Sequence, residues 1–205
     1  MQQGISKIII ITIIVGVLVV GAGIGYWFGR GSKIGILEQS LAGQKENRGS
    51  QAGVPYVGDG FTIIPPTGWI QTHLPSTLVS YQNSSEVQPK GSTAEKINFK
   101  SYMAVSSYST SGKTLDEVVD LVKRQVESVA PTISFLPVSD GTIDNQPAKF
   151  IEANVSMQEV DFKVMLAVAM KGDKYFTISS NTTTEKWPEY RDIFYNVLNS
   201  FKFKY

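Results

Sequence analysis

The sequence predicts an α+β fold, a mostly antiparallel sheet flanked by helices, preceded by one transmembrane helix. Apolar residues alternate with polar ones over residues 148–157 and 160–170, which is the period of a half-buried strand. Residues 114–130 and 185–200 instead carry apolar stripes at helical spacing, and residues 8–29 contain no charged side chain. These patterns divide the chain into a short tail (1–7), a membrane segment (8–29), a flexible linker (30–58) and an α+β domain (59–205).

The composition excludes several classes of chemistry. The chain has 205 residues, with 19 Lys and Arg against 18 Asp and Glu and a formal net charge of +1. This balance argues against a nucleic-acid partner, because general nucleic-acid binders carry a strong basic excess. Since the chain contains no Cys, disulfides, thiolate metal sites, a Cys nucleophile and lipidation at a Cys are excluded. No Gly-rich phosphate cradle is present either, and we expect no cofactor.

Residues 8–29 are predicted to cross a membrane as a helix and to contact lipid. At about 1.5 Å per residue this helix is roughly 33 Å long, enough for a hydrocarbon core of about 30 Å. Lys7 and Arg30 bracket the segment, and charged side chains resist entering hydrocarbon. Tyr26 and Trp27 lie at its far end, where amphipathic rings favour the headgroup region. The segment therefore has both the length and the flanks of a single-pass anchor.

The alternative for this segment is a cleaved signal peptide. The small residues 21–23 suit a cleavage site, but apolar side chains continue beyond them, which favours an uncleaved anchor. Basic residues such as Arg30 and Lys33 follow the span, and their number alone would favour a cytoplasmic domain. Long domains nevertheless translocate largely regardless of charge, and a tail of seven residues is easily retained. We therefore expect the C-terminal domain on the extracytoplasmic side of the cell membrane.

Gly21, Gly25 and Gly29 recur every four residues and so share one face of the predicted membrane helix. Small residues at this spacing let a second helix approach closely, which makes them helix-packing candidates for a homo-oligomer. Glycine is also common in membrane helices without such a role.

In the domain, turn signals separate a series of short apolar runs. Residues 61–64 read as a strand that Pro65 and Pro66 end, since proline donates no ladder hydrogen bond. The hydrophilic residues 83–95 are expected to form an exposed loop, and the polar residues 71–75 another. Further strands are expected at residues 77–82, 97–108, 133–138, 148–157, 160–170 and 175–180. Tight connections between the last three predict an antiparallel meander, and apolar residues on both faces of 160–170 predict a sheet covered on both sides.

The two helices have recognisable ends. Thr114 and Glu117 have the spacing of a capping box at the start of the first helix, and Pro131 follows its end. The second helix is expected from about residue 185, with Thr183 or Thr184 as its N-cap and a proline in its first turn.

The chemistry-bearing residues are sparse, and we expect no catalytic, cofactor or metal residue. His73 is the only imidazole, and no Ser lies in a nucleophile elbow with which it would form a triad. Asp116, Glu117 and Asp120 are the densest carboxylates; a pair one turn apart can share a cation, but acids at a helix start are explained by the helix dipole. N-glycosylation acceptor patterns occur at Asn83, Asn154 and Asn181.

Three motifs resemble the PsbP/Mog1-like superfamily. The first is the run Phe61 to Trp69, a strand followed by prolines and a Gly-Trp pair; the second is the long helix at residues 114–130. The third is the ending, a strand from Tyr175, a helix rich in aromatic residues and a closing Ser200-Phe201 pair. The resemblance covers about residues 59–205.

This resemblance implies an antiparallel sheet flanked by helices, in a domain that is usually non-enzymatic. Plant and cyanobacterial members are accessory subunits of photosystem II, a fungal member binds a small GTPase, and many bacterial members are exported or membrane-anchored. No residue here matches a photosystem docking motif, so that role is not carried over. We therefore expect an extracytoplasmic protein-interaction or assembly module with an unidentified protein partner. The alternatives are a hydrolase with a carboxylate-based site and a protein that binds a small ligand or metal.

Overall fold

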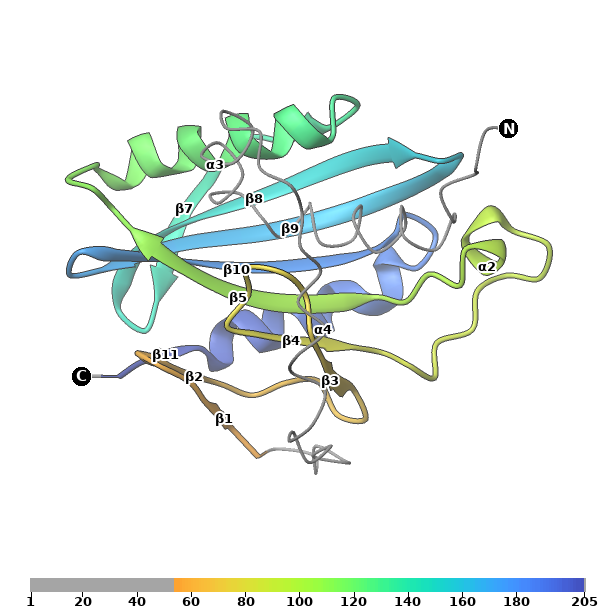
Figure 1. Ribbon diagram of the computed structural model, residues 1–205, viewed down its shortest axis with the longest axis horizontal. Helices are drawn as coiled ribbons and strands as arrows, with labels where there is room; N and C mark the ends of the chain where they lie inside the picture. Colours follow the sequence, from red (N-terminus) through yellow and green to blue (C-terminus); the bar gives the residue numbers. More distant parts are fainter. Residues whose placement is uncertain (1–53, 205) are drawn as a thin grey trace, which may run out of the picture.

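The computed structural model describes residues 54–204, in which two antiparallel sheets combine with three helices (Figure 1). The larger sheet is built from β3 (Ile70–Thr72), β4 (Val79–Gln82), β5 (Tyr102–Ser109), β6 (Ser134–Phe135), β7 (Ser139–Ile143), β8 (Gln146–Met157), β9 (Val160–Lys171) and β10 (Lys174–Thr183). The smaller sheet is built from β1 (Tyr56–Val57), β2 (Phe61–Ile63) and β11 (Lys202–Phe203). The helices are α2 (Thr93–Lys96), α3 (Leu115–Val129) and α4 (Trp187–Ser200).

The larger sheet has the strand order β3-β4-β5-β10-β9-β8-β6, and β7 pairs with β8 beside β6. Strands β8, β9 and β10 form the antiparallel meander that their tight connections predicted. The turn between β8 and β9 consists of Gln158 and Glu159, with φ of 51° and 62°. These positive angles match a two-residue hairpin turn of type I′, whose twist suits the flanking strands. β5 then pairs with β10, which places the first half of the domain against the last long strand.

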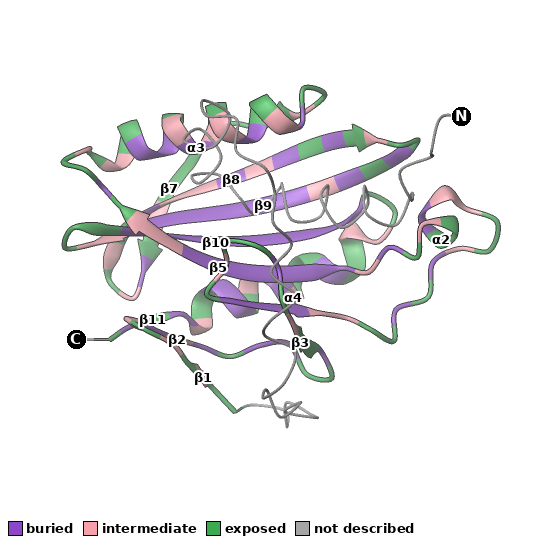
Figure 2. Cartoon of the chain, in the orientation of Figure 1, coloured by how far each residue is buried: buried purple, intermediate pink, exposed green. Residues whose placement is uncertain are grey.

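Both faces of the larger sheet are covered, as the sequence predicted. On β9, Val164, Leu166 and Val168 belong to the core that α3 covers. The alternate residues Met165 and Ala167 belong to a second core with α4 and β2. Figure 1 shows α3 along one face and α4 along the other, and Figure 2 shows the central strands buried along most of their length. The strand period thus divides one sheet between two hydrophobic cores.

Helix α3 begins and ends as predicted. Thr114 is its N-cap and accepts a hydrogen bond from the backbone N–H of Glu117, while the Glu117 carboxylate accepts one from the backbone N–H of Thr114. The buried stripe comprises Val118, Val119, Val122 and Val126. Because valine has modest helix propensity, this helix depends on its packing against β8 and β9.

The segment expected as an exposed loop and a long third strand has a different structure. Residues 93–96 form the short helix α2, capped by Ser92, whose hydroxyl accepts a hydrogen bond from the N–H of Glu95 at 3.0 Å. Asn98 then has φ of 51°, a left-handed backbone conformation that is incompatible with an extended strand at this residue. Strand β5 therefore begins at Tyr102 instead of residue 97.

The expected start of the last helix is also corrected. Thr183 belongs to β10, opposite Phe162, and Thr184 donates its N–H to the Asp161 carbonyl, so neither caps α4. The N-cap is Lys186, which makes no side-chain capping hydrogen bond, and Pro188 lies in the first turn as predicted. Elsewhere, β3 includes residues 71 and 72, the first two of the segment 71–75 that was expected as a loop. The strand expected at 133–138 is limited to β6.

The folded part extends slightly beyond the predicted domain start. β1, within the segment 30–58 expected as a linker, pairs with β2. The predicted membrane helix at 8–29 and its Gly21, Gly25 and Gly29 lie outside the described residues. Within residues 54–204, no helix combines the length and the apolar character needed to cross a membrane.

Candidate functional site

The residues singled out from the sequence have separate environments. His73 is exposed and directly follows β3. Within residues 54–204, no group of three or more His, Asp or Glu side chains is arranged to hold a metal ion. Of the acids at the start of α3, Asp116 and Glu117 make the contacts described next, and Asp120 is exposed.

Asp116 joins the start of α3 to the sheet. The Lys149 ammonium lies 2.7 Å from a carboxylate oxygen of Asp116 and 2.7 Å from one of Asp140. Hydrogen bonds to these two carboxylates, Asp116 first, raise the pKa of Lys149. The hydrogen bond from the Thr114 N–H lowers the pKa of Glu117. Glu117 thus has a role at the helix end. The ion pair of Asp116 with Lys149 was not predicted from the sequence.

The segment between β4 and β5 buries a carboxylate that sequence reasoning placed in an exposed loop. Glu86 is 4% exposed. One carboxylate oxygen accepts a hydrogen bond from the N–H of Ser101, and the other lies 2.9 Å from the Ser101 hydroxyl. That hydroxyl is also hydrogen-bonded to the hydroxyl of Thr182 on β10, 2.7 Å away. The Lys100 ammonium donates to the Glu86 carbonyl oxygen. The carboxylate therefore anchors this segment to the sheet.

A second contact fastens the same segment to α4. The Asn83 side-chain amide donates to the hydroxyl oxygen of Tyr190 at 2.8 Å. Burial raises the pKa of Tyr190 to about 12, and Glu86 contributes in the same direction. The phenol is therefore neutral at physiological pH. This cluster of polar groups is largely satisfied by its own members, which is typical of a structural network.

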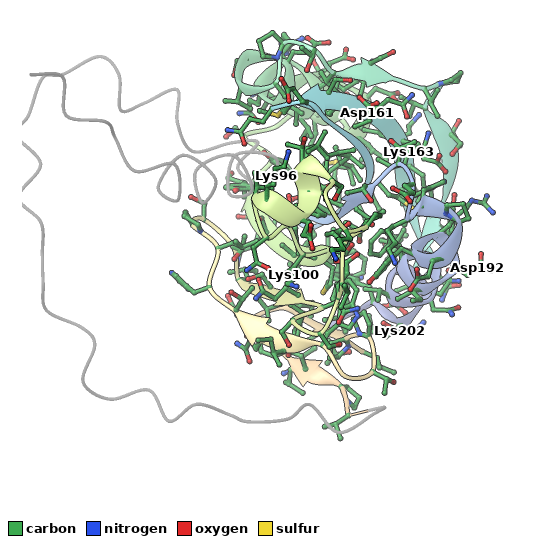
Figure 3. All side chains as sticks on the ribbon, turned by 90° about the vertical axis from the view of Figure 1, so that its right-hand side faces the viewer. Lys96, Lys100, Asp161, Lys163, Asp192 and Lys202 are labelled. Atoms are coloured by element: carbon green, nitrogen blue, oxygen red, sulfur yellow. The ribbon has the colours of Figure 1, made fainter. Side chains whose placement is uncertain are left out.

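Beside this network lies a cavity of about 340 Å³ at the end of the sheet where α2 meets the β8–β9 turn, which we call the end cavity. Figure 3 views the molecule from this end, with Asp161 on β9 and Lys96 on α2. The end cavity is lined by Gln88, Ser92, Thr93, Ala94, Glu159, Val160, Asp161, Thr183, Thr184 and Glu185.

Two buried side chains of the end cavity have an oxygen without a hydrogen-bond partner. They are Gln88 and Thr183, each 5% exposed, and the unpartnered atoms are the Gln88 Oε1 and the Thr183 Oγ1. The Gln88 amide nitrogen is used, since it donates to the Phe99 carbonyl at 3.3 Å. Buried polar atoms are normally hydrogen-bonded, so unpartnered oxygens that border a cavity suit a ligand that brings donors.

A second hollow, the edge groove, has a volume of about 240 Å³ and lies on the α4 side of β8. It is lined by Leu136, Pro137, Ser139, Phe150, Glu152, Met165 and Tyr195. Leu136, which lines the groove, and Val138, which lies between the lining residues Pro137 and Ser139 in the sequence, are each 37% exposed. The groove thus combines apolar walls with one carboxylate, next to the edge strands of the larger sheet.

Neighbours fix the position of the Glu152 carboxylate. The Tyr195 hydroxyl donates to one of its oxygens at 3.2 Å, and the Lys163 ammonium lies 3.8 Å from the other. Lys163 also donates to Asn154 at 2.9 Å and lies over the Trp187 ring. Burial, followed by the charge of Glu152, raises the pKa of Tyr195. The Glu152 carboxylate is therefore held as an acceptor with a defined direction, which suits recognition of a donor.

The end cavity and the polar network beside it include residues whose roles the sequence pattern did not indicate. Glu86 and Gln88 lie in a hydrophilic stretch, and only the burial of that stretch by α2 and β10 gives them their environment. Of the three glycosylation acceptor patterns, Asn181 is 2% exposed and Asn83 is bonded to Tyr190, whereas Asn154 is exposed.

Comparisons with known proteins agree on the fold. The PsbP family model matches residues 54–203. No curated protein matches the sequence. Among solved structures, cyanobacterial PsbP (CyanoP) from Synechocystis superposes with a TM-score of 0.58 at 18% identity, over 80% of this chain and 100% of that one. LpqN of Mycobacterium tuberculosis, described as involved in cell envelope biogenesis, gives a TM-score of 0.55 at 10% identity, over 74% of this chain and 90% of that one.

Proposed function

Because this chain belongs to the PsbP family, we propose that it acts as a non-catalytic protein-interaction or assembly module, anchored through residues 8–29 and displayed outside the cell membrane. The structural neighbour LpqN has a stated part in building the cell envelope, which is compatible with an assembly role at the cell surface. The larger sheet, which packs against a hydrophobic core on each of its two faces, provides a rigid platform for such a role.

The observation that carries the proposal is the edge groove. Leu136 and Val138 expose apolar surface beside the fixed carboxylate of Glu152. Apolar contact area next to an oriented polar group is the usual composition of a protein-binding hot spot. A partner side chain with an apolar stem and a donor at its end fits this combination. The carboxylate is already bonded to Tyr195, which supports a binding role over proton transfer.

The proposal is tested by site-specific photo-crosslinking of the full chain in its native membrane. A photoreactive amino acid replaces Leu136 in the groove or, as the control, Ile70 on β3 at the opposite edge of the sheet, which is 42% exposed. We expect one recurring protein adduct from position 136 and none from position 70. The substitution Val138→Asp should remove that adduct. An adduct pattern that is the same at both edges, or unaffected by Val138→Asp, would contradict an interface at the groove.

The predicted topology is tested separately by adding protease to intact cells or spheroplasts. Digestion of the domain, in parallel with a control protein known to lie on the outer face, is the expected result. Protection of the domain while the control is digested would place it on the cytoplasmic side.

A further inference from the structure

Two of the residues that line the end cavity, Gln88 and Thr183, each have a buried side-chain oxygen that lacks a hydrogen-bond partner in the described part of the chain, the Gln88 Oε1 and the Thr183 Oγ1. From this arrangement we propose that the end cavity binds a primary ammonium group on an alkyl stem, the chemistry shared by a lysine side chain and a polyamine. The inference concerns a different cavity from the edge groove, so it stands or falls independently of the interaction role proposed above.

The charge around the end cavity selects a cation. Glu159, Asp161 and Glu185 all line it and are all exposed. The Asp161 carboxylate also accepts a hydrogen bond from the Ser156 hydroxyl. The Gln88 amide N–H₂, which is the donor group of that side chain, is already engaged with the Phe99 carbonyl. An anionic ligand would therefore meet the acidic side chains of Glu159 and Glu185, with this amide donor already in use. A ligand that is positive and rich in donors fits both the charges and the unpartnered oxygens.

The placement of the acids favours an ammonium over a metal ion. Glu159 lies in the β8–β9 turn, Asp161 lies near the start of β9, and Glu185 follows β10. A hard divalent cation needs about six oxygens at 2.0–2.6 Å from one point. Within residues 54–204 no three acidic or His side chains converge in this way. An ammonium has three N–H donors that point in different directions, so it can contact dispersed acceptors singly.

The remaining walls suit the alkyl stem. Ala94 and Val160, whose side chains are apolar, line the cavity and are largely buried. The volume of about 340 Å³ lies at the low end of the range of ligand pockets, roughly 300–1,000 Å³. Such a cavity accommodates one slender side chain. Lysine and polyamines carry methylene stems that can lie along these walls while the ammonium reaches the oxygens.

The test is an NMR titration of the full-length chain in detergent micelles. The probe is Nα-acetyl-lysine N-methylamide, and its matched control is the norleucine derivative, which has the stem but no ammonium. We expect saturable shifts of the Ala94 and Val160 methyl resonances with the lysine probe alone. Spermidine is titrated in parallel: tighter binding of spermidine would identify a free polyamine as the ligand, and tighter binding of the lysine probe a protein side chain. Equal shifts with norleucine, or no saturation with either amine, would overturn the proposal.

Measuring the amine affinity of substituted chains tests whether the amine binds in the end cavity. Thr183→Val removes a hydroxyl that has no partner, so the fold should be retained while the affinity for the amine falls about tenfold, the effect of one hydrogen bond to a charged group. Glu185→Gln should weaken binding severalfold, and more at low than at high salt. Glu127→Gln, which changes an exposed acid on α3, is the control and should leave binding unchanged. Unchanged affinity in Thr183→Val, or displacement of the amine by micromolar calcium, would contradict an ammonium site.

Discussion

The backbone N–H of Ile64 donates a hydrogen bond to the hydroxyl oxygen of Ser200 at 2.9 Å. This contact joins the end of β2, near the start of the domain, to the last turn of α4, near its end. The Ser200 hydroxyl also bonds to the Val197 carbonyl within its own helix at 2.7 Å. Two of the motifs that resemble the PsbP family in sequence, the strand before the prolines and the closing Ser-Phe pair, are therefore neighbours in space.

Replacing Ser200 with alanine should destabilise the domain by about 1 kcal/mol, because the Ile64 N–H loses its protein partner. Urea-induced unfolding measures the change. Ser128→Ala is the matched control, since Ser128 makes the same helix-internal bond, to the Gln125 carbonyl at 2.7 Å, but lies exposed on α3. If both substitutions have equal effects, the link to β2 contributes no stability.

The second core is organised around Phe61 and Phe201, whose rings stack with centroids 5.4 Å apart and an interplanar angle of 5°. Both side chains are fully buried. We expect Phe61→Ala to cost about 3–5 kcal/mol in the free energy of unfolding, because it leaves a large cavity. Val57→Ala on the neighbouring strand, where the side chain is 61% exposed, should cost less than about 0.5 kcal/mol. A small effect of Phe61→Ala would mean that the smaller sheet is not integral to the core.

In the β8–β9 turn, a substitution is expected to increase the stability of the domain instead of decreasing it. Glu159 has φ of 62°, where residues other than glycine are disfavoured by about 1–2 kcal/mol. Because glycine also loses more chain entropy on folding, Glu159→Gly should stabilise the domain by a net of about 0.5 kcal/mol. The same change at Glu127, inside α3, should destabilise it by about 1 kcal/mol. Urea unfolding of both variants tests the pair, and loss of stability in both would show that the turn is not strained.

The long elements of the fold were predictable because each carries its own signal. The alternation in β8 and β9 follows from burial of the sheet on both faces, and Thr114 with Glu117 marks the start of α3 within a few neighbouring residues. Such signals depend on residues close together in the sequence. They remain readable without knowledge of the tertiary structure.

The short elements and the two cavities depend instead on partners that are distant in the sequence. β11 exists because Phe203 pairs with Phe61, and the sequence near residue 203 contains no strand signal of useful length. Glu86 lies in a hydrophilic segment but is buried, because its carboxylate is hydrogen-bonded to Ser101, whose hydroxyl is in turn hydrogen-bonded to Thr182. The end cavity is likewise assembled from four separate stretches of chain, so its composition was not apparent from any one motif.

The buried Tyr175 should cause the domain to lose folding stability at alkaline pH. It is 1% exposed, and burial, followed by its neighbour Tyr108, raises its pKa to about 12 from the ordinary 10. The folded state thus holds the phenolic proton more tightly than the unfolded state. The resulting stabilisation is complete below pH 10 and is lost as the pH rises from about 10 towards 12.

Tyr175→Phe removes this ionisation and keeps the ring, which packs against Tyr108 with centroids 5.5 Å apart. At pH 7 the variant should differ from the parent chain by less than about 0.5 kcal/mol, since the apolar packing is retained. Above pH 10 the parent should lose stability more steeply, so that the variant becomes the more stable of the two. Urea unfolding at pH 7, 9, 10 and 11 measures both curves. If the two curves stay parallel throughout, Tyr175 does not retain its proton in the folded state beyond the ordinary range.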